Sequence, residues 1–346
     1  MLTYTARRLA INIPVLLVFS FVMYLVLYKA GDPVARYRQI PGIRAEDLQR
    51  IIKLNHLDEP ALPGYWHWLT AFVHGDWGVS ATNQASTAAH EIFTRMPATL
   101  ELLGGALLVS LLIGAPLGVY SAVRRYSGFD YTATGFAYLG YAMPTFLLGL
   151  LLQMFAIWMK DNGWAIIPLV FGSILVLMGI FRLRQGLSPR ITVAVGAVVV
   201  LISLVFWNSF GGHGNLVLYT GTRFSFGNSS MLTLDHLRHL ILPVVALSVV
   251  SIAGWSRYQR SATLDVLNAD YLRTARAKGL SERRVIGKHA LRNALLPLIT
   301  VIAIDAGALF SGAVVTEAVF AWPGIGLLVV NAIQWRDYPI RNDGID

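Results

Sequence analysis

The stretch that decides the fold reads Tyr271-Leu-Arg-Thr-Ala-Arg-Ala-Lys-Gly279-Leu-Ser-Glu-Arg-Arg-Val-Ile-Gly-Lys-His289-Ala-Leu-Arg-Asn-Ala-Leu-Leu-Pro297. It is rich in charged residues, with Ala and Gly between them, and it lies between two hydrophobic runs, at 240–256 and 293–316. Both runs reach the length that crosses a bilayer, about 17–25 residues. The sequence therefore predicts that residues 257–292, called the elbow from here on, form a cytoplasmic connection that a partner grips.

The pattern of the elbow predicts a helix, a tight turn and a second helix. Spacings of three and four residues place four side chains on one stripe of a helix: Leu264, Leu267, Tyr271 and Ala275. Gly279 supplies the left-handed residue that follows a helix end. Ser281 is a typical N-cap for a second helix that runs toward Pro297.

The turn has two features that suit contact with another protein. Ala275, Ala277 and Gly279 add little side-chain bulk, so another backbone could approach closely. Basic side chains that could pair with acidic groups flank the turn: Arg276, Lys278, Arg283 and Arg284. The simpler interpretation is a basic loop on anionic lipid, where each Lys or Arg contributes about 1 kcal/mol. The elbow holds nine Lys and Arg against three acidic residues, and the pattern alone leaves both interpretations open.

The composition is that of a polytopic membrane protein. Of the 346 residues, 55% are hydrophobic and 14% are charged, and the mean hydropathy is +0.57. In soluble domains about a quarter of residues are charged. Apolar runs of spanning length lie at 9–28, 102–123, 131–159, 162–181, 191–210, 240–256 and 293–316. We therefore expect an all-α membrane protein with about seven spans.

The ends of the apolar pattern need separate interpretation. An eighth run, 318–335, is interrupted by Pro323, Gly324 and Gly326, which favours a re-entrant or interfacial helix over a regular span. The first run follows Arg7 and Arg8 and is too long for the core of a signal peptide, so we expect a retained first span. Lys and Arg of the short loops gather on the side of the N-terminus, which predicts that this terminus is cytoplasmic.

The formal net charge of +9 has the same explanation and indicates no nucleic-acid partner. The absence of cysteine excludes disulfides and thiolate chemistry in this chain.

The chain divides into five expected segments: an N-terminal transmembrane helix at 1–29, an external subdomain at 30–98, transmembrane helices 2 and 3 at 99–159, an inserted transmembrane hairpin with an external loop at 160–235, and a transmembrane core at 236–346. The core contains the elbow at 257–292 and an external re-entrant segment at 317–339. Trp and Tyr residues between 65 and 77 suggest that the external subdomain rests on the membrane surface. The region is either a solvated connector with an aromatic patch at the membrane interface or a docking surface for a partner.

Residues 271–279 and 289–297 resemble the signature of ABC importer permeases in its dipeptide and oligopeptide transporter form. Further motifs extend this resemblance over most of the chain: Gly31-Asp-Pro33, Gly75-Asp-Trp-Gly78, Met96-Pro-Ala-Thr-Leu-Glu101, Pro144-Thr-Phe146, His239-Leu-Ile-Leu-Pro243, Glu317-Ala-Val-Phe-Ala-Trp-Pro-Gly-Ile-Gly326 and Arg336-Asp-Tyr-Pro339. By these motifs the chain is similar to the first, B-type permease subunit of importers for dipeptides, oligopeptides and nickel. It departs from the family by the hairpin at 162–210 and by ending soon after Pro339, where the family continues into a final span.

The resemblance implies a type I ABC importer transmembrane domain whose elbow contains a coupling helix. The implied contacts with the ATPase are Tyr271, Arg273, Ala275, Ala277, Lys278, Gly279 and Leu280. The implied partners are a second permease subunit, two ATPase subunits, an external substrate-binding protein and a peptide substrate, in the lipid bilayer of a bacterial cell membrane. ATP and magnesium would be bound by the ATPase subunits, since the chain has no Gly-x-x-x-x-Gly-Lys-Ser/Thr loop. The chain is thus expected to be no enzyme but the membrane subunit of an ATP-driven translocase.

Ionisable residues within spans are candidate functional residues because they are costly in lipid. Asp305 is either a cavity-facing carboxyl group on the substrate pathway, able to attract a substrate ammonium group, or a hydrogen-bonded packing group at the interface with the second permease. Glu101 and Glu317 lie near the outer ends of spans, where solvation is easy, and we expect structural roles for both. Pro144 is expected to kink the third span and is the second candidate for the pathway.

No metal site is expected at His236 and His239. Their spacing is that of a metal pair, but further ligands at a suitable spacing are missing, which favours capping or packing roles.

The leading hypothesis is a permease that imports short peptides delivered by an external binding protein. A permease for nickel chelates or glutathione in the same family is the alternative, and the sequence does not separate these substrates. An independent secondary transporter would need several intramembrane ionisable residues or an inverted repeat, neither of which is visible. A membrane scaffold is the remaining alternative.

Overall fold

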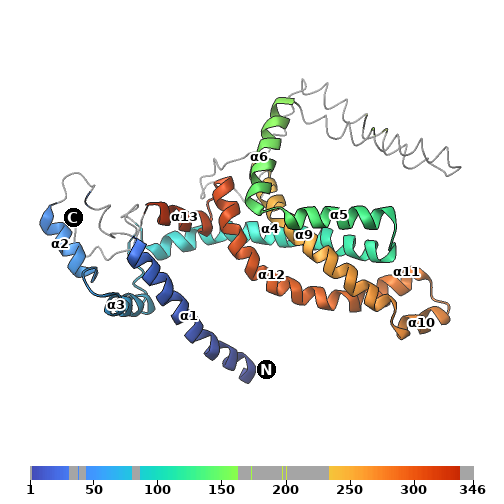
Figure 1. Cartoon of the computed structure of the whole chain (residues 1–346), viewed down its shortest axis with the longest axis horizontal. Coiled ribbons are helices and arrows are strands. Elements are labelled where there is room, and N and C mark those ends of the chain that lie inside the picture. The colour runs from blue at the N-terminus through green and yellow to red at the C-terminus, as the bar shows by residue number, and fades with distance from the viewer. Residues whose placement is uncertain are drawn as a thin grey trace. The chain divides into compact units, whose positions relative to one another are not determined.

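The computed structural model describes residues 2–30, 38, 44–79, 86–162, 173, 197, 200 and 234–335. Apart from short connections, these residues form helices, shown in Figure 1: α1 (Leu2–Ala30), α2 (Ala45–Leu54), α3 (Ala61–Val73), α4 (Ala88–Val123), α5 (Gly128–Ala142), α6 (Thr145–Asn162), α9 (Leu234–Leu267), α10 (Asp270–Ala277), α11 (Glu282–Arg284), a π-helix (Val285–Ala290), α12 (Leu291–Phe320) and α13 (Ile325–Trp335). They belong to two compact units, one made of the described residues up to Pro97 and from Leu328 onward, the other of those from Ala98 to Leu327. The all-α membrane fold is confirmed.

Within the described residues, four stretches of helix are long and apolar enough to cross a membrane: Ala6–Lys29, Ala88–Val123, His236–Leu267 and Val285–Phe320. A fifth is added if α5 and α6 together count as one span. The predicted count of seven is not confirmed, since the spans expected at 162–181 and 191–210 lie almost entirely outside the described residues. The residues between this hairpin and α9, where the external loop of the 160–235 segment is expected, and the end of the segment expected at 317–339 fall outside them as well.

The third expected span, 131–159, is not one continuous helix. It is divided into α5 and α6, whose axes are bent by 106° at a short break. Met143 has an extended backbone there, with φ −87° and ψ 121°. Pro144 explains the break, because its ring disfavours a helical conformation at the preceding residue and it has no N–H to donate. The chain at Pro144 therefore forms a break between two helices rather than the expected kink within one helix.

The segment expected to be re-entrant is not helical between Phe320 and Ile325, where Pro323 and Gly324 predicted an interruption. Helix α12 ends at Phe320, Ala321 adopts a left-handed conformation with φ 49°, and α13 begins at Ile325. With 11 residues, α13 is about 16 Å long at about 1.5 Å per residue, too short for a hydrocarbon core of about 30 Å.

Aromatic packing between α1 and α3 forms the interior of the first unit. Tyr65 is buried, and its ring makes edge contacts with Phe21 and Tyr24 at centroid distances of 5.0 and 5.6 Å. Its hydroxyl lies 2.8 Å from the Ser20 hydroxyl. Gly64 leaves the space that the Tyr24 hydroxyl occupies, because a Cβ at this position would lie 2.6 Å from that oxygen. Each aromatic pair stabilises the contact by about 1 kcal/mol beyond its buried area.

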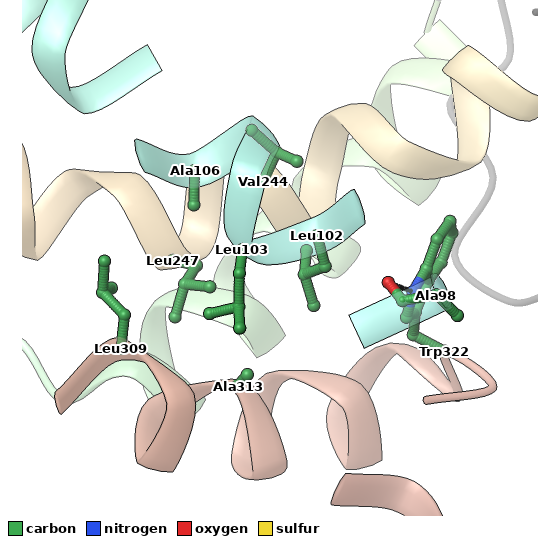
Figure 2. Packing of buried hydrophobic residues seen from close by; sticks show 9 residues of the cluster. All are labelled: Ala98, Leu102, Leu103, Ala106, Val244, Leu247, Leu309, Ala313 and Trp322. Carbon is green, nitrogen blue, oxygen red and sulfur yellow. Dashed lines mark hydrogen bonds between the residues drawn. The ribbon is translucent and has the colours of Figure 1, made fainter. Parts of the chain in front are cut away.

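The second unit is built on α4, α9 and α12. Figure 2 shows buried side chains from these helices gathered between them, with Trp322 at one end: Ala98, Leu102, Leu103, Ala106, Val244, Leu247, Leu309, Ala313 and Trp322. The Trp322 indole donates a hydrogen bond to the Ala98 carbonyl at 2.9 Å. The cluster ties the C-terminal end of α12 to α4, so α12 is held at one end by this core and at the other by the elbow.

Small residues allow α9 to approach α4 closely. Many buried positions of α4 are Ala, Gly or Ser, as is common where membrane helices pack. The contact is tightest at Gly118, where a Cβ would lie 2.4 Å from the Ser256 carbonyl oxygen and 2.7 Å from Gln259 Cβ. The backbones of α4 and α9 therefore touch near the start of the elbow.

Candidate functional site at the elbow

The elbow joins α9 to α12 through α10, a turn, α11 and the π-helix (Figure 1). Helix α9 ends at Leu267 and α10 begins at Asp270, because Ala269 leaves the helical conformation with φ −72° and ψ 143°. The predicted continuous stripe from Leu264 to Ala275 is therefore wrong. The break changes the phase of the helix, so that α10 buries Leu272 and Ala275 and leaves Tyr271 exposed.

The elbow has a hydrophobic core of its own. Leu272 and Ala275 of α10 are buried against Val285 and Ala290 of the π-helix, and Leu280 packs against this cluster from the turn. Three of these side chains, Leu272, Val285 and Ala290, are fully shielded from solvent. The elbow is thus a small packed unit, and a force on its surface is carried by side chains in contact.

The turn of the elbow is a Schellman motif around Gly279. Gly279 has φ +76°, as the sequence predicted for a left-handed residue after a helix. Its N–H donates to the Arg276 carbonyl at 2.9 Å, and the Leu280 N–H donates to the Ala275 carbonyl at 3.4 Å. These two bonds together with the apolar contact of Leu280 define the motif. The turn conformation is therefore confirmed, and its backbone angle is one that glycine adopts without the steric cost of a side chain.

The second helix begins after Ser281, as predicted, but differs in kind. The Ser281 carbonyl accepts from the Arg284 N–H at 2.8 Å, while its side chain makes no capping bond. One turn of α-helix leads into the π-helix Val285–Ala290 before α12 begins. The sequence did not predict this π-helix, since no residue pattern distinguishes it from an α-helix. Such segments interrupt regular α-helices and frequently lie at functional sites.

Polar contacts fix α10 to its neighbours. Arg276 Nε lies 2.7 Å from Glu282 Oε1, across the Gly279 turn. Asn293 of α12 donates from Nδ2 to the Tyr271 hydroxyl at 2.9 Å. Arg276, expected to pair with a partner, therefore already pairs within the elbow. The two contacts connect α10 to both ends of the segment that leads into α12.

The seven residues expected to contact a partner divide into two groups. Tyr271, Arg273, Ala277, Lys278 and Gly279 are exposed, and a Cβ at Gly279 would meet nothing within 4 Å. Ala275 is buried and Leu280 is half-buried, and both pack into the elbow's own core. Five of the seven residues therefore lie on the surface of α10 and its turn, while the other two support that surface from inside.

An ion pair between a half-buried arginine and a buried aspartate anchors the start of the elbow, and the sequence analysis missed it. Arg260 donates from Nε and Nη2 to the two carboxylate oxygens of Asp130, both at 2.7 Å. Asp130 also accepts from the Ser121 hydroxyl and from the Tyr126 N–H, and only 3% of Asp130 is exposed. Two-point pairing of this kind is geometrically specific. It holds the first turn of α5 against α9 near the elbow.

A local signal for this anchor was present. Ser127 and Asp130 have the spacing of an N-cap and its third helical residue, and the Ser127 side chain accepts from the Asp130 N–H at 3.2 Å. That spacing predicts the helix start, but only the packing of α5 on α9 reveals Arg260 as the partner.

Asp305 is hydrogen-bonded within the chain. Trp255 of α9 donates from Nε1 to Asp305 Oδ2 at 2.6 Å, which links α9 to the middle of α12. This contact is a hydrogen bond within the chain, and a place of Asp305 at an interface with a second permease stays a prediction. A role of Asp305 or Pro144 in a substrate pathway stays a prediction.

Glu317 corrects the expectation of easy solvation at the outer end of the last core span. It is fully buried and accepts from the Thr99 hydroxyl at 2.7 Å and from the Leu327 N–H at 3.0 Å. The chain folds back over it after Phe320, and glycines make this possible. A Cβ at Gly324 would lie 2.3 Å from the Glu317 carboxyl group, and one at Gly326 would lie 2.9 Å from Glu317 Oε2. The expected structural role is confirmed by these bonds.

Glu101 and the two histidines also have packing roles. His236 Nε2 is hydrogen-bonded to Glu101 Oε1, and the His236 ring packs on Trp322 at a centroid distance of 5.7 Å. His236 and His239 are both buried. These contacts agree with the interpretation of the pair as packing residues.

Comparison with known proteins gives a consistent result. The profile of the family described as "Binding-protein-dependent transport system inner membrane component" matches residues 114–186 and 189–344. The dipeptide transport system permease protein of Escherichia coli (strain K12) is 36% identical over 352 aligned positions, covering 100% of this chain and 91% of the relative. The oligopeptide transport system permease protein of Bacillus subtilis (strain 168) is 34% identical, covering 98% of this chain and 90% of the relative. The di/tripeptide transport system permease protein of Pseudomonas aeruginosa (strain UCBPP-PA14) is 36% identical, with 100% and 91% covered.

Proposed function

We infer the function of this chain from its family, since it belongs to the binding-protein-dependent transport system inner membrane components. It is a multi-pass membrane protein with an all-α fold. We propose that it is the permease subunit of an ATP-binding-cassette importer that translocates short peptides delivered by an external binding protein. The single observation that carries this proposal is the identity of 34–36% over nearly the whole chain to dipeptide and oligopeptide permeases.

The similarity favours peptides over the alternatives. The relatives compared above are named for dipeptides, di- and tripeptides and oligopeptides, and none of these names mentions nickel or glutathione. Membership of a binding-protein-dependent family also disfavours a secondary transporter that works alone and a scaffold without transport.

The elbow is the proposed contact with an ATPase subunit. Its exposed face offers Tyr271, Arg273, Ala277, Lys278 and Gly279, and its own packed core supports that face. Motion of an ATPase against α10 would pass to α12 through the π-helix and the hydrogen bond between Asn293 and Tyr271. Rigid-body rocking of packed helices is a common way to alternate access to the two sides of a membrane.

The remaining partners follow from the same proposal. A second permease subunit would complete the pathway, and two ATPase subunits would bind ATP and magnesium, for which this chain has no phosphate-binding loop. The N-terminus and the elbow would both be cytoplasmic, in agreement with the basic residues of the short loops.

The test uses an exposed position that the fold does not need. Ala277→Phe adds a large side chain to the exposed face of α10, so we expect loss of copurifying ATPase and at least a tenfold drop in uptake of a labelled dipeptide. The matched control is Ala45→Phe, the same change at an exposed helical alanine of α2. Both variants are expressed with the genetic neighbours of this chain and extracted in mild detergent.

Each outcome bears on a different part of the proposal. Normal ATPase copurification and normal uptake in Ala277→Phe would reject the elbow as the contact. Normal ATP-driven uptake of another solute, without dipeptide uptake by the wild type, would reject the peptide and leave the importer intact.

A further inference from the structure

Three side chains that commonly bind metal ions lie together where α2 is joined to α3. His56 and Glu59 belong to the connection and His67 belongs to the second turn of α3. The ligand atoms that they offer all lie within 4.8 Å of one another. Across the part of the chain that the structure describes, this is the one group of three or more His, Asp or Glu with that property.

The spacing of these atoms suits a tetrahedral ion. His56 Nδ1 lies 2.7 Å from Glu59 Oε1, and His67 Nε2 lies 3.4 Å from Glu59 Oε2. In a tetrahedral zinc site with bonds of about 2.1 Å, neighbouring ligand atoms are about 3.4 Å apart. The carboxylate therefore needs only a small shift away from His56 to admit an ion between the three groups.

The backbone holds His56 in a conformation that glycine usually adopts. His56 has φ +54°, and it follows α2 as the left-handed residue of a Schellman motif. Its N–H donates to the Lys53 carbonyl at 3.3 Å, and the Leu57 N–H donates to the Ile52 carbonyl at 3.0 Å. The motif aims the imidazole of His56 at Glu59 and His67, an orientation that a glycine at this position could not supply.

The carboxylate of Glu59 is incompletely satisfied. Its Oε2 atom is shielded from solvent and forms no hydrogen bond with any residue that the structure describes, although His67 Nε2 approaches it to 3.4 Å. Buried oxygens of this kind are uncommon in folded proteins. A cation beside Oε2 would supply the missing interaction.

The two imidazole rings can adjust to an ion. They are stacked with centroids 4.0 Å apart and an interplanar angle of 5°, and their side chains are 42% and 47% exposed. A metal ion lies in the plane of each imidazole that binds it, so the parallel rings must tilt toward each other. Their exposure leaves room for this rotation and gives an ion access from solvent.

We propose that His56, Glu59 and His67 form a binding site for a divalent cation of the zinc type, with water in the remaining position. Two imidazole nitrogens and one carboxylate oxygen are donors that suit zinc better than magnesium or calcium. The ion fastens the connection after α2 to α3. This site is independent of the transported substrate and of the ATPase contact.

The test is a titration of the purified full-length chain, carrying a tag without histidine, with Co²⁺ followed by competition with Zn²⁺. We expect one Co²⁺ per chain with the visible absorption of a four- or five-coordinate complex, displaced by Zn²⁺ and not by Mg²⁺. Glu59→Gln and His67→Ala each remove a ligand and are expected to weaken binding at least tenfold. His90→Gln, at an exposed histidine of α4 outside the cluster, is expected to change the affinity less than twofold.

The proposal is overturned if the wild type binds no Co²⁺ with this stoichiometry, or if all three variants bind it equally well. Far-ultraviolet circular dichroism checks that each variant keeps its helices. His56→Asn is a further variant that removes an imidazole while tolerating the left-handed backbone, and it decides the matter if His67→Ala loses helix.

Discussion

The segments before and after α12 each contain a turn that depends on glycine, for opposite physical reasons. At the N-terminal side, Gly279 has a left-handed backbone, and a Cβ there would meet nothing within 4 Å. At the C-terminal side, Gly324 and Gly326 lie against the buried carboxyl group of Glu317, and a Cβ at either would come within 3 Å of it. The elbow glycine is favoured by conformation and leaves its surface open, whereas the other two are required by space and close a buried site.

The Gly279 turn is therefore a surface open to a partner, called the working surface below. The contact of Gly324 and Gly326 with Glu317 is a buried contact between two segments, called the structural joint. An open turn on a packed support can receive a partner, and its substitution should affect coupling more than folding. A joint filled by a buried carboxyl group has no free surface, so its substitution should reduce the amount of folded protein. The five predictions below test this contrast.

The largest effect is expected for Gly326→Ala. The new methyl group would lie 2.5 Å from Val314 Cα, a backbone atom in the C-terminal third of α12 that cannot move aside cheaply. Overpacking of this severity costs about 3 kcal/mol. The thermal unfolding midpoint of the purified chain in detergent should fall sharply, and the yield with it. Gly307→Ala, on α12 in open space, is the matched control, and equal midpoints for the two variants would contradict the steric account.

Glu317→Ala should rank second. It removes the acceptor of the Thr99 hydroxyl and the Leu327 N–H, and each buried donor left unpaired costs about 1–3 kcal/mol. Glu317→Gln keeps one acceptor oxygen and should cost less. Unfolding midpoints measure both.

A double-mutant cycle between Gly324 and Glu317 tests whether the carboxyl group is what excludes a side chain at Gly324. Gly324→Ala forces a methyl group against the Glu317 carboxyl group, so its cost should shrink in the Glu317→Ala background. Additive costs would show that the carboxyl group is not what excludes a side chain at Gly324.

Gly279→Ala should rank third in stability and first in its effect on coupling. A non-glycine residue in the left-handed region costs about 1–2 kcal/mol, without any clash. We expect a modest fall in the unfolding midpoint and a marked loss of ATP-driven uptake, with Gly279→Asn milder in both. Gly287→Ala, a glycine of the π-helix with open space around it, is the control and should leave both unchanged. Full uptake by Gly279→Ala would count against the turn as a working surface.

Arg276→Ala should have the smallest effect. Its partner Glu282 has a side chain that is 61% exposed, and exposed ion pairs contribute about 0–1 kcal/mol. Arg276→Ala, Glu282→Ala and the double variant form a cycle, read by unfolding midpoints, in which the coupling should be below about 1 kcal/mol. A larger coupling would mean that the pair supports the turn as strongly as the Schellman bonds do.

Much of the fold and part of the site could be predicted from the sequence. The apolar runs predicted the helices α1, α4, α9 and α12, and Gly279 predicted the turn, because these depend on composition and on neighbours along the chain. The break before α10 was missed, since Asn268 and Ala269 carry no strong stop signal. The stripe drawn across that break was wrong for the same reason.

Contacts between distant residues lay beyond the sequence. Glu317 was expected to be solvated because its position along the span was known, while the chain that folds back over it was not. The pairing of Asp130 with Arg260 joins residues that are 130 positions apart. The hydrogen bond from Trp255 to Asp305 joins helix α9 to helix α12. The grouping of His56 with His67 depends on how the connection after α2 turns back on α3.

The sequence by itself therefore determined the class of the protein, the helical elements and the exposed turn of the elbow. These follow from hydrophobicity and backbone preference, which act over a few residues at a time. Only the tertiary structure decided which polar groups are buried, paired or brought together. Their burial is set by the packing of helices far apart in the chain, where a glycine can leave room for a backbone or for a carboxyl group.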